Sequence, residues 1–349
     1  MPHHRVLQDS IRSASHSAGV LVLLGHSMPF YRSIPASFFG MVLGLVGLGG
    51  NWRLATRLWG MSPVIGETIM AVAFVVWLLV SASYTLKWCL HRDAAVEEAT
   101  HPVQCCFIGL APATTALMAV VLAPHSHGLA MVALVVGGVG HVLFSIWRLG
   151  GMLQGGREVT TVTPVIYLPS VAGNFITAIA AGTLGYPSWG VLFFGAGVFA
   201  WLALESVIVN RLFHAQPLPL PLRPTLGIQL APPVVAVAAW LANTSGEPAL
   251  LVQATWGYGM FQFLLLARLI PWIAEQPFSP AYWAFTFGVT ALSGTALTMT
   301  SRGLTGAIPQ LAPVLFVVTN LVLAAIIVGT VIRAFQGKLF PAAVIRSAP

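Results

Sequence analysis

Charged residues are scarce in this sequence. Asp, Glu, Lys and Arg make up 7% of the 349 residues, hydrophobic residues make up 57%, and the mean hydropathy is +0.85. Soluble globular domains carry roughly 25% charged residues. The composition therefore excludes a soluble enzyme or binding domain and indicates an integral membrane protein in a lipid bilayer.

Cysteine is also rare, with Cys89 and the neighbours Cys105 and Cys106 as its three members. Vicinal cysteines seldom form a strain-free disulfide, so nothing indicates an oxidised scaffold. His125 and His127 lie in a short loop without a nearby Cys, Asp or Glu, and two ligands do not make a metal site. We therefore expect no metal, no cofactor and no catalytic residues. A membrane-embedded enzyme or sensory module, the rival class, would need such a cluster.

Long apolar runs are what the sequence has in abundance. A membrane-crossing helix needs roughly 20 mostly apolar residues, and about ten such windows fill the chain. They lie near 35–52, 65–87, 104–122, 128–148, 164–183, 189–210, 225–243, 249–271, 280–299 and 307–335. The sequence predicts an all-α membrane domain over 34–338, a cytoplasmic N-terminal tail over 1–33 and a C-terminal tail over 339–349.

The basic residues predict the orientation. If the N-terminus is cytoplasmic, thirteen of the sixteen Lys and Arg fall inside and only Arg53, Arg57 and Arg302 fall outside. Those inside are Arg5, Arg12, Arg32, Lys87, Arg92, Arg148, Arg157, Arg211, Arg223, Arg268, Arg333, Lys338 and Arg346. This bias fits an even number of helices with both termini cytoplasmic. The net charge of +7 is thus a topology signal, and we expect no nucleic-acid partner.

Proline divides the predicted helices into two sets. Pro35, Pro112, Pro169, Pro232 and Pro233 fall within or at the start of odd-numbered helices, whereas the even-numbered ones carry none in their interiors. Proline frees a carbonyl that hydrocarbon cannot satisfy, so the odd helices should face protein or water. We expect five helical hairpins, with odd helices inside and even helices outside.

The ninth predicted helix has Phe285-Thr286-Phe287-Gly288 in place of an interior proline, and Gly288 is its expected weak point. In a ring of small, neutral walls, a phenylalanine that points inward would close the lumen by its bulk and by dewetting. The alternative is that both rings pack against neighbouring helices.

Four segments carry a family resemblance: YLPSVAGNF (167–175), GYPSWGVLFFGAGVFAW (185–201), WGYGMFQFLLLARLIPW (256–272) and WAFTFG (283–288). They resemble the bacterial TehA family, relatives of the plant slow-type anion channels and of fungal dicarboxylate and sulfite transporters. The resemblance implies ten helices in five hairpins around a central pore, a homotrimer with one pore per subunit, and a place in the bacterial inner membrane.

The resemblance also implies an anion channel whose pore is occluded by a phenylalanine on the ninth helix. In the WAFTFG motif of this sequence, the residue at the position of that gate is Phe287. Phe285 is the second candidate, because two residues so spaced cannot share a helix face. The positions that we expect to line the pore or to kink its helices are Pro35, Phe39, Pro112, Thr115, Pro169, Asn174, Pro232, Pro233 and Gly288.

The middle of each odd helix lacks Lys and Arg, so the predicted pore is neutral. Selection should then come from hydroxyl and backbone donors, helix dipoles and the basic inner surface, with broad permeability to small inorganic anions such as chloride and nitrate. The alternative is a secondary transporter or exporter of dicarboxylate, sulfite or tellurite-like oxyanions. It would need a substrate site near the midplane and an ionisable group on the path.

Glu205 is an acidic residue within the sixth predicted helix, where an ionised side chain is costly and usually faces the bundle. One interpretation makes it a proton or substrate site. The other makes it a structural partner for a hydroxyl or a basic residue, with Arg211 about two turns away. Because the sixth helix belongs to the outer set, we favour the structural role.

Overall fold

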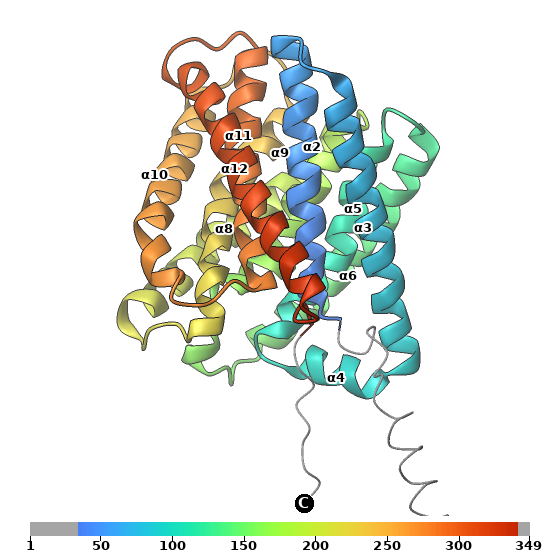
Figure 1. The fold of residues 1–349 in the computed structure, drawn as a ribbon, viewed down its shortest axis with the longest axis vertical. Coiled ribbons are helices and arrows are strands. Elements are labelled where there is room, and N and C mark those ends of the chain that lie inside the picture. The colour runs from blue at the N-terminus through green and yellow to red at the C-terminus, as the bar shows by residue number, and fades with distance from the viewer. Residues whose placement is uncertain (1–33, 341–349) are drawn as a thin grey trace, which may run out of the picture.

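The structure, a computed structural model, describes residues 34–340 (Figure 1). All regular secondary structure in this part of the chain is helical. The predicted tail over 1–33 and residues 341–349 lie outside the described residues. The described chain begins and ends at the same end of the bundle, where the ring of Phe38 stacks on that of Phe340 at 5.6 Å. We call this the tail end, and the other the opposite end.

Five helices form the inside of the bundle. They are α2 (Phe39–Trp59), α5 (Leu110–Leu122), α7 (Gly173–Thr183), α9 (Ala231–Asn243) and α11 (Thr286–Ser301). Each contacts the next along the chain, and α11 contacts α2, so the contacts close into a ring. In the segments that contain the first four, between 61% and 83% of the most apolar window is buried.

Five longer helices cover this ring. They are α3 (Pro63–Leu90), α6 (His127–Leu153), α8 (Pro187–His214), α10 (Leu250–Ile273) and α12 (Ala307–Phe335). Each packs against the inner helix that precedes it. Only 17% to 33% of their most apolar windows is buried, so their exposed side chains are suited to lipid. This difference in burial agrees with the expected division into inner and outer helices.

Nine helices within residues 34–340 are long and apolar enough to cross a membrane. The helix α11 is not among them. It has 16 residues, of which five are threonine and two are serine. Its place in the ring, rather than its hydropathy, makes it equivalent to the other inner helices.

Each inner helix begins with a segment that is wound differently from an α-helix. These segments are η2 (Ala36–Phe38), η3 (Gln104–Gly109), η5 (Pro164–Tyr167) with the π-turn η6 (Leu168–Ala172), η7 (Leu220–Leu230) and η8 (Pro280–Phe285). Several predicted prolines lie here: Pro35 caps η2, and Pro169 lies in η6. A proline lacks the amide proton for a regular i to i−4 bond, so it favours such irregular turns.

The expectation that the even-numbered helices lack interior prolines is wrong. Pro271 lies inside α10 and Pro313 inside α12. Both lie within about two turns of a helix end, where fewer backbone hydrogen bonds are at stake than at the centre. Proline therefore distinguishes inner from outer helices only near the middle of the bundle.

Glycine lets an outer helix approach its inner partner closely. A Cβ atom at Gly137 of α6 would lie 2.1 Å from the backbone nitrogen of Ala116 in α5. Any larger residue there would push the two backbones apart, which is the general reason for small residues at membrane helix interfaces.

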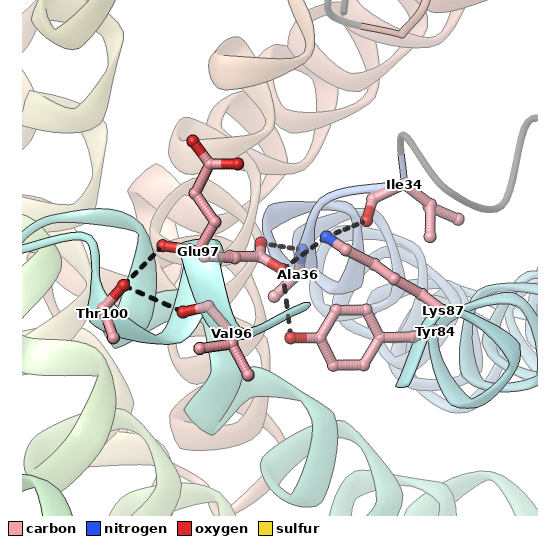
Figure 2. A network of polar contacts seen from close by, with 8 residues as sticks. Ile34, Ala36, Tyr84, Lys87, Val96, Glu97 and Thr100 are labelled. Carbon is pink, nitrogen blue, oxygen red and sulfur yellow. Dashed lines mark hydrogen bonds and ion pairs between the residues drawn. The ribbon is translucent and has the colours of Figure 1, made fainter. Parts of the chain in front are cut away.

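A short helix, α4 (Arg92–Thr100), lies across the tail end and closes a buried polar network (Figure 2). Lys87 Nζ lies 2.8 Å from Glu98 Oε2 and donates to the carbonyl of Ile34 at 3.1 Å. Glu98 also accepts from the amide of Ala36 at 2.8 Å and from the hydroxyl of Tyr84 at 3.1 Å. The network thus joins α3 and α4 to the start of the first inner helix.

The charges of this network are well satisfied. The side chains of Lys87 and Glu98 are 6% and 7% exposed, and each makes at least one further hydrogen bond besides the ion pair. A buried ion pair contributes little relative to an apolar pair, but removing one partner leaves an uncompensated charge. The network therefore specifies where the chain enters the bundle.

We expect Glu98→Gln to destabilise the protein by about 3 kcal/mol, because it leaves the Lys87 ammonium buried without a counter-charge. Thermal unfolding of the detergent-solubilised protein measures the effect. The matched control is Glu97→Gln, since Glu97 is exposed and points away from the network in Figure 2. Equal unfolding temperatures for the two variants would contradict the assignment.

Candidate functional site

Two cavities lie inside the ring of inner helices, one toward each end. The tail-end cavity is lined by the first turns of the inner helices, with polar contributions from Ser37, Gln104, Tyr167 and Thr225. The opposite-end cavity is larger, about 800 Å³ against about 130 Å³. Its lining comes from the later turns of the inner helices and from the first turns of α3.

Phe287 lines both cavities, and no other described residue does so. Its side chain is half-buried, whereas Phe285 is 7% exposed and lines neither cavity. Phe285 instead packs on η7, where a Cβ atom at Gly227 would lie 2.7 Å from its ring, and it stacks on Tyr282 at 6.3 Å. The two rings thus have different surroundings, as their spacing predicts.

The backbone around Phe287 is held tightly by α2. A Cβ atom at Gly44 would lie 2.3 Å from Thr286 Oγ1, and one at Gly47 would lie 2.1 Å from Thr290 Oγ1. Thr290 Oγ1 in turn donates to the carbonyls of Thr286 at 2.8 Å and Phe287 at 3.0 Å. Close packing on both sides of Phe287 therefore fixes the turn of α11 that carries it.

Gly288 packs against the neighbouring inner helix. A Cβ atom there would lie 2.8 Å from Leu230 Cγ and 3.2 Å from the amide nitrogen of Ala231. The change from 3₁₀ to α geometry falls just before it, between Phe285 and Thr286. Gly288 thus allows α11 to approach α9 closely.

Of the other predicted pore positions, Pro232 lines the tail-end cavity. The positions that line neither cavity are Pro35, Phe39, Pro112, Thr115, Pro169, Asn174, Pro233 and Gly288. The prolines among them lie in the first turns of the inner helices or in the irregular segments before them, and so affect the winding of these helices.

The polar and aromatic members of that set have partners within the protein. Thr115 donates to the carbonyl of Ala111 at 2.8 Å, and Asn174 donates to that of Ser170 at 2.5 Å. Phe39 packs edge-on against Tyr84 at 5.8 Å. Sequence patterns identify a polar residue on an inner helix, but they do not distinguish one that bonds its own backbone from one that faces a cavity.

The residues that give the opposite-end cavity its charge are not among the site residues predicted from the sequence. Arg53, Arg57, Glu67 and Arg302 all line it. The three arginines are the ones that the basic-residue pattern predicts to lie outside, so the sequence predicts that they lie on one side of the membrane. Their convergence on one cavity is not predicted, because they come from α2 and from the end of α11, far apart along the chain.

Glu205 of α8 accepts hydrogen bonds from four side chains. Oε2 accepts from the hydroxyl of Tyr167 and from Trp201 Nε1 at 2.8 Å, and Oε1 accepts from Tyr258 at 2.9 Å and from Gln229 at 3.3 Å. Together these residues join α8 to η5, η7 and α10. Glu205 lines neither cavity.

The hydrogen bonds of Glu205 support the structural interpretation, with hydroxyl, indole and amide groups as its partners. Arg211, the basic residue that the sequence offers as a possible partner, instead donates to the carbonyl of Thr160 at 3.5 Å. Tyr167 belongs both to this cluster and to the tail-end cavity. The hydrogen bond from Tyr167 therefore links Glu205 to the wall of the tail-end cavity.

Comparison with known proteins identifies the family of this arrangement. The family model described as voltage-dependent anion channel matches residues 33–331, which includes every inner helix. The chain belongs to this family. Its members are known as anion channels and transporters, as the names of its relatives show.

The family relatives come from bacteria and plants. The chain is 33% identical to a tellurite resistance protein TehA homolog of Haemophilus influenzae over 308 residues, 88% of this chain and 93% of that protein. It is 27% identical to the S-type anion channel SLAH2 of Arabidopsis thaliana over 90% of this chain and 62% of that protein. It is 26% identical to the guard cell S-type anion channel SLAC1 of the same plant, over 90% and 58% respectively.

We expect Glu205→Gln to destabilise this member of the voltage-dependent anion channel family by about 2 kcal/mol. The amide replaces one acceptor oxygen with a donor, which leaves two of the four donors without a partner. Thermal unfolding in detergent measures the change. Ser206→Ala is the matched control, because Ser206 is the exposed neighbour on α8. A variant as stable as this control would show that the cluster contributes little.

Proposed function

We propose that this protein is a gated channel for small monovalent anions, closed by Phe287. Ten membrane-crossing helices in five hairpins would surround one central pore, made of the tail-end and opposite-end cavities. The proposal rests on one observation above all: Phe287 is the side chain common to the linings of both cavities. Membership of a family of anion channels and transporters supports the choice of ion.

The closure would be hydrophobic. A phenyl ring between two cavities excludes water by bulk, and an ion cannot pass without its hydration shell or a substitute for it. Thr290, one turn after the ring, lines the opposite-end cavity, but its hydroxyl proton goes to backbone carbonyls. Nothing polar next to Phe287 on α11 would therefore stabilise an anion there while the ring is in place.

Beyond the ring, the tail-end cavity would bind anions weakly. Its described lining has no charged residue, and its polar groups are hydroxyls and an amide. All five inner helices start at this end, so the positive ends of their dipoles surround the cavity. Weak attraction from dipoles and hydroxyls permits rapid exit, which conduction requires.

We further propose a homotrimer in the bacterial inner membrane, with both termini cytoplasmic and a pore in each subunit. The described chain begins and ends at one end of the bundle, which an even number of crossings requires. The outer helices expose large apolar side chains that would contact lipid or neighbouring subunits.

The alternative is a secondary transporter of dicarboxylate, sulfite or tellurite-like oxyanions. Two cavities separated by a thin barrier also suit alternating access. Such a transporter would usually place an ionisable group on its path at the midplane. The charged residues in the described cavity linings are confined to the opposite end. This distribution favours the channel.

We expect Phe287→Ala to raise the anion conductance at least about tenfold over the parent, which corresponds to removal of a barrier of about 1.4 kcal/mol. Planar-bilayer recording in symmetric chloride measures it. The matched control is Phe285→Ala, which removes an equal ring that packs on η7 outside both cavities. A Phe287→Ala current no larger than the parent's would overturn the gate assignment.

We expect the open pore to discriminate poorly between chloride and nitrate, because the described lining of the tail-end cavity, on one side of the ring, offers hydroxyls and helix dipoles rather than a fixed charge. Reversal potentials of Phe287→Ala under a chloride–nitrate gradient test this. They should lie near zero, and the current should show unitary steps. A flux that saturates at millimolar substrate without unitary steps would instead identify a transporter.

A further inference from the structure

The two cavities differ sharply in charge. The described lining of the opposite-end cavity holds Arg53, Arg57, Arg302 and Glu67, which carry three positive charges and one negative charge, a formal net charge of +2. The described lining of the tail-end cavity holds no charged residue. A permeating anion would therefore meet a fixed positive potential on one side of Phe287 and a neutral wall on the other.

One of the three arginines is neutralised locally. Arg53 Nε and Nη2 lie 2.7 and 2.8 Å from the two carboxylate oxygens of Glu67, a bidentate pair, and Nη1 donates to the carbonyl of Val120 at 3.1 Å. His125 Nε2 lies 3.4 Å from the same carboxylate. Arg53 and Glu67 thus contribute a dipole rather than a net charge, and Arg57 and Arg302 supply the field.

Arg302 is fixed at the mouth of the opposite-end cavity. It donates to the carbonyls of Leu241 and Thr244, the latter at 2.9 Å, at the end of α9. It follows directly after α11, the helix that carries Phe287. Because carbonyl oxygens bear no net charge, these bonds orient the guanidinium without cancelling its charge.

Arg57 lies in the last turn of α2, the helix next to α11 in the ring, and is exposed. The cavity thus has one cationic side chain from the first inner helix and one from the end of the last. These are the two helices whose close packing closes the ring. Two cationic side chains that line one opening focus the potential inside it.

We infer that the opposite-end cavity is an anion-collecting vestibule, in which Arg57 and Arg302 raise the local anion concentration and make the open channel conduct asymmetrically. The inference rests on the proposed channel function and adds the part of the pore that attracts the ion. Anion flow from the opposite end toward the tail end is then larger than the reverse at equal driving force.

The distribution of Lys and Arg over the whole sequence predicts the reverse, a larger anion flow from the tail end toward the opposite end. Most Lys and Arg belong to the predicted cytoplasmic side, which suggests that anions gather at the tail end. Yet none of those that fall within residues 34–340 lines the tail-end cavity. Charges outside an opening act through water and salt, whereas charges in its wall act at short range.

The size of the effect follows from Coulomb's law. One unit charge roughly 10 Å from an anion in water changes the anion's local concentration about twofold. Salt at about 1 M reduces the Debye length to about 3 Å and should abolish the effect.

The test changes the charge at one position in one channel. Arg57→Cys is made in the full chain together with Phe287→Ala and Cys89→Ser, since Cys89 is the exposed native thiol and Cys105 and Cys106 are buried. Single channels are recorded at about 0.01 M and about 1 M chloride, where the Debye length is about 30 Å and about 3 Å. A cationic and an anionic methanethiosulfonate reagent are added to each side in turn.

We expect the cationic reagent to raise the anion current from the opposite end toward the tail end about twofold. The anionic reagent should lower the same current. Both effects should occur only when the reagent is added to one side of the bilayer, and that side is then the one that the opposite end faces. Both effects should vanish at about 1 M chloride. In the same background, Glu67→Gln should raise this current, because it leaves Arg53 without its counter-charge.

The matched control is Arg268→Cys, at an exposed arginine of α10 that lines neither cavity. Its modification should leave the current unchanged. If the Phe287→Ala background conducts but modification at position 57 has no charge-dependent effect, the vestibule is overturned while the channel stands. If the background itself is silent, the proposed channel function fails, and the vestibule fails with it.

Discussion

The close approach of α2 to α11 is the constraint on which the rest of this structure depends. Gly44 and Gly47 meet Thr286 and Thr290 so closely that no side chain fits between them. The amide of Asn51 also donates to the carbonyl of Thr290 at 3.1 Å, across 239 positions of sequence. This contact joins the first inner helix to the last and so closes the ring that encloses both cavities.

The inner helices can be rich in hydroxyls because many of those hydroxyls bond the backbone of their own helix. Thr114, Thr177 and Thr295 each donate to a carbonyl one turn back, at 2.7 to 2.8 Å. In a low-dielectric interior an unpaired polar group is costly, so such bonds make a threonine nearly as acceptable as valine. The cavity walls are mostly apolar and offer few free donors, which fits a pathway that attracts ions at its mouth and binds them weakly within.

Much of the fold could be predicted from the sequence, because burial in a membrane leaves a strong pattern. Long apolar windows located the helices, and prolines and small residues separated those inside from those outside. The prediction that the outer helices lack interior prolines failed near helix ends, as Pro271 and Pro313 show. The tenth segment was harder to recognise by hydropathy, since the threonines of α11 reduce it.

The candidate site was less predictable, because it depends on which way side chains point. The motif at 283–288 narrowed the choice to two rings, and the surroundings of Phe285 and Phe287 then separated them. Thr115 and Asn174 look like pore residues by type, yet they bond their own helices. The Lys87–Glu98 pair and the arginine-lined cavity require three-dimensional convergence that no spacing in the sequence reveals.

The network around Glu98 also has a mechanical consequence. The carbonyl of Ile34 and the amide of Ala36 are both bonded to it, so the chain is clamped at two points just before α2 begins. A pull on the segment ahead of Ile34 would load α3 and α4 first, and the glycine contacts of α2 would be shielded from it. The clamp thus bears such a force ahead of α2, the helix whose glycines hold the turn that carries Phe287.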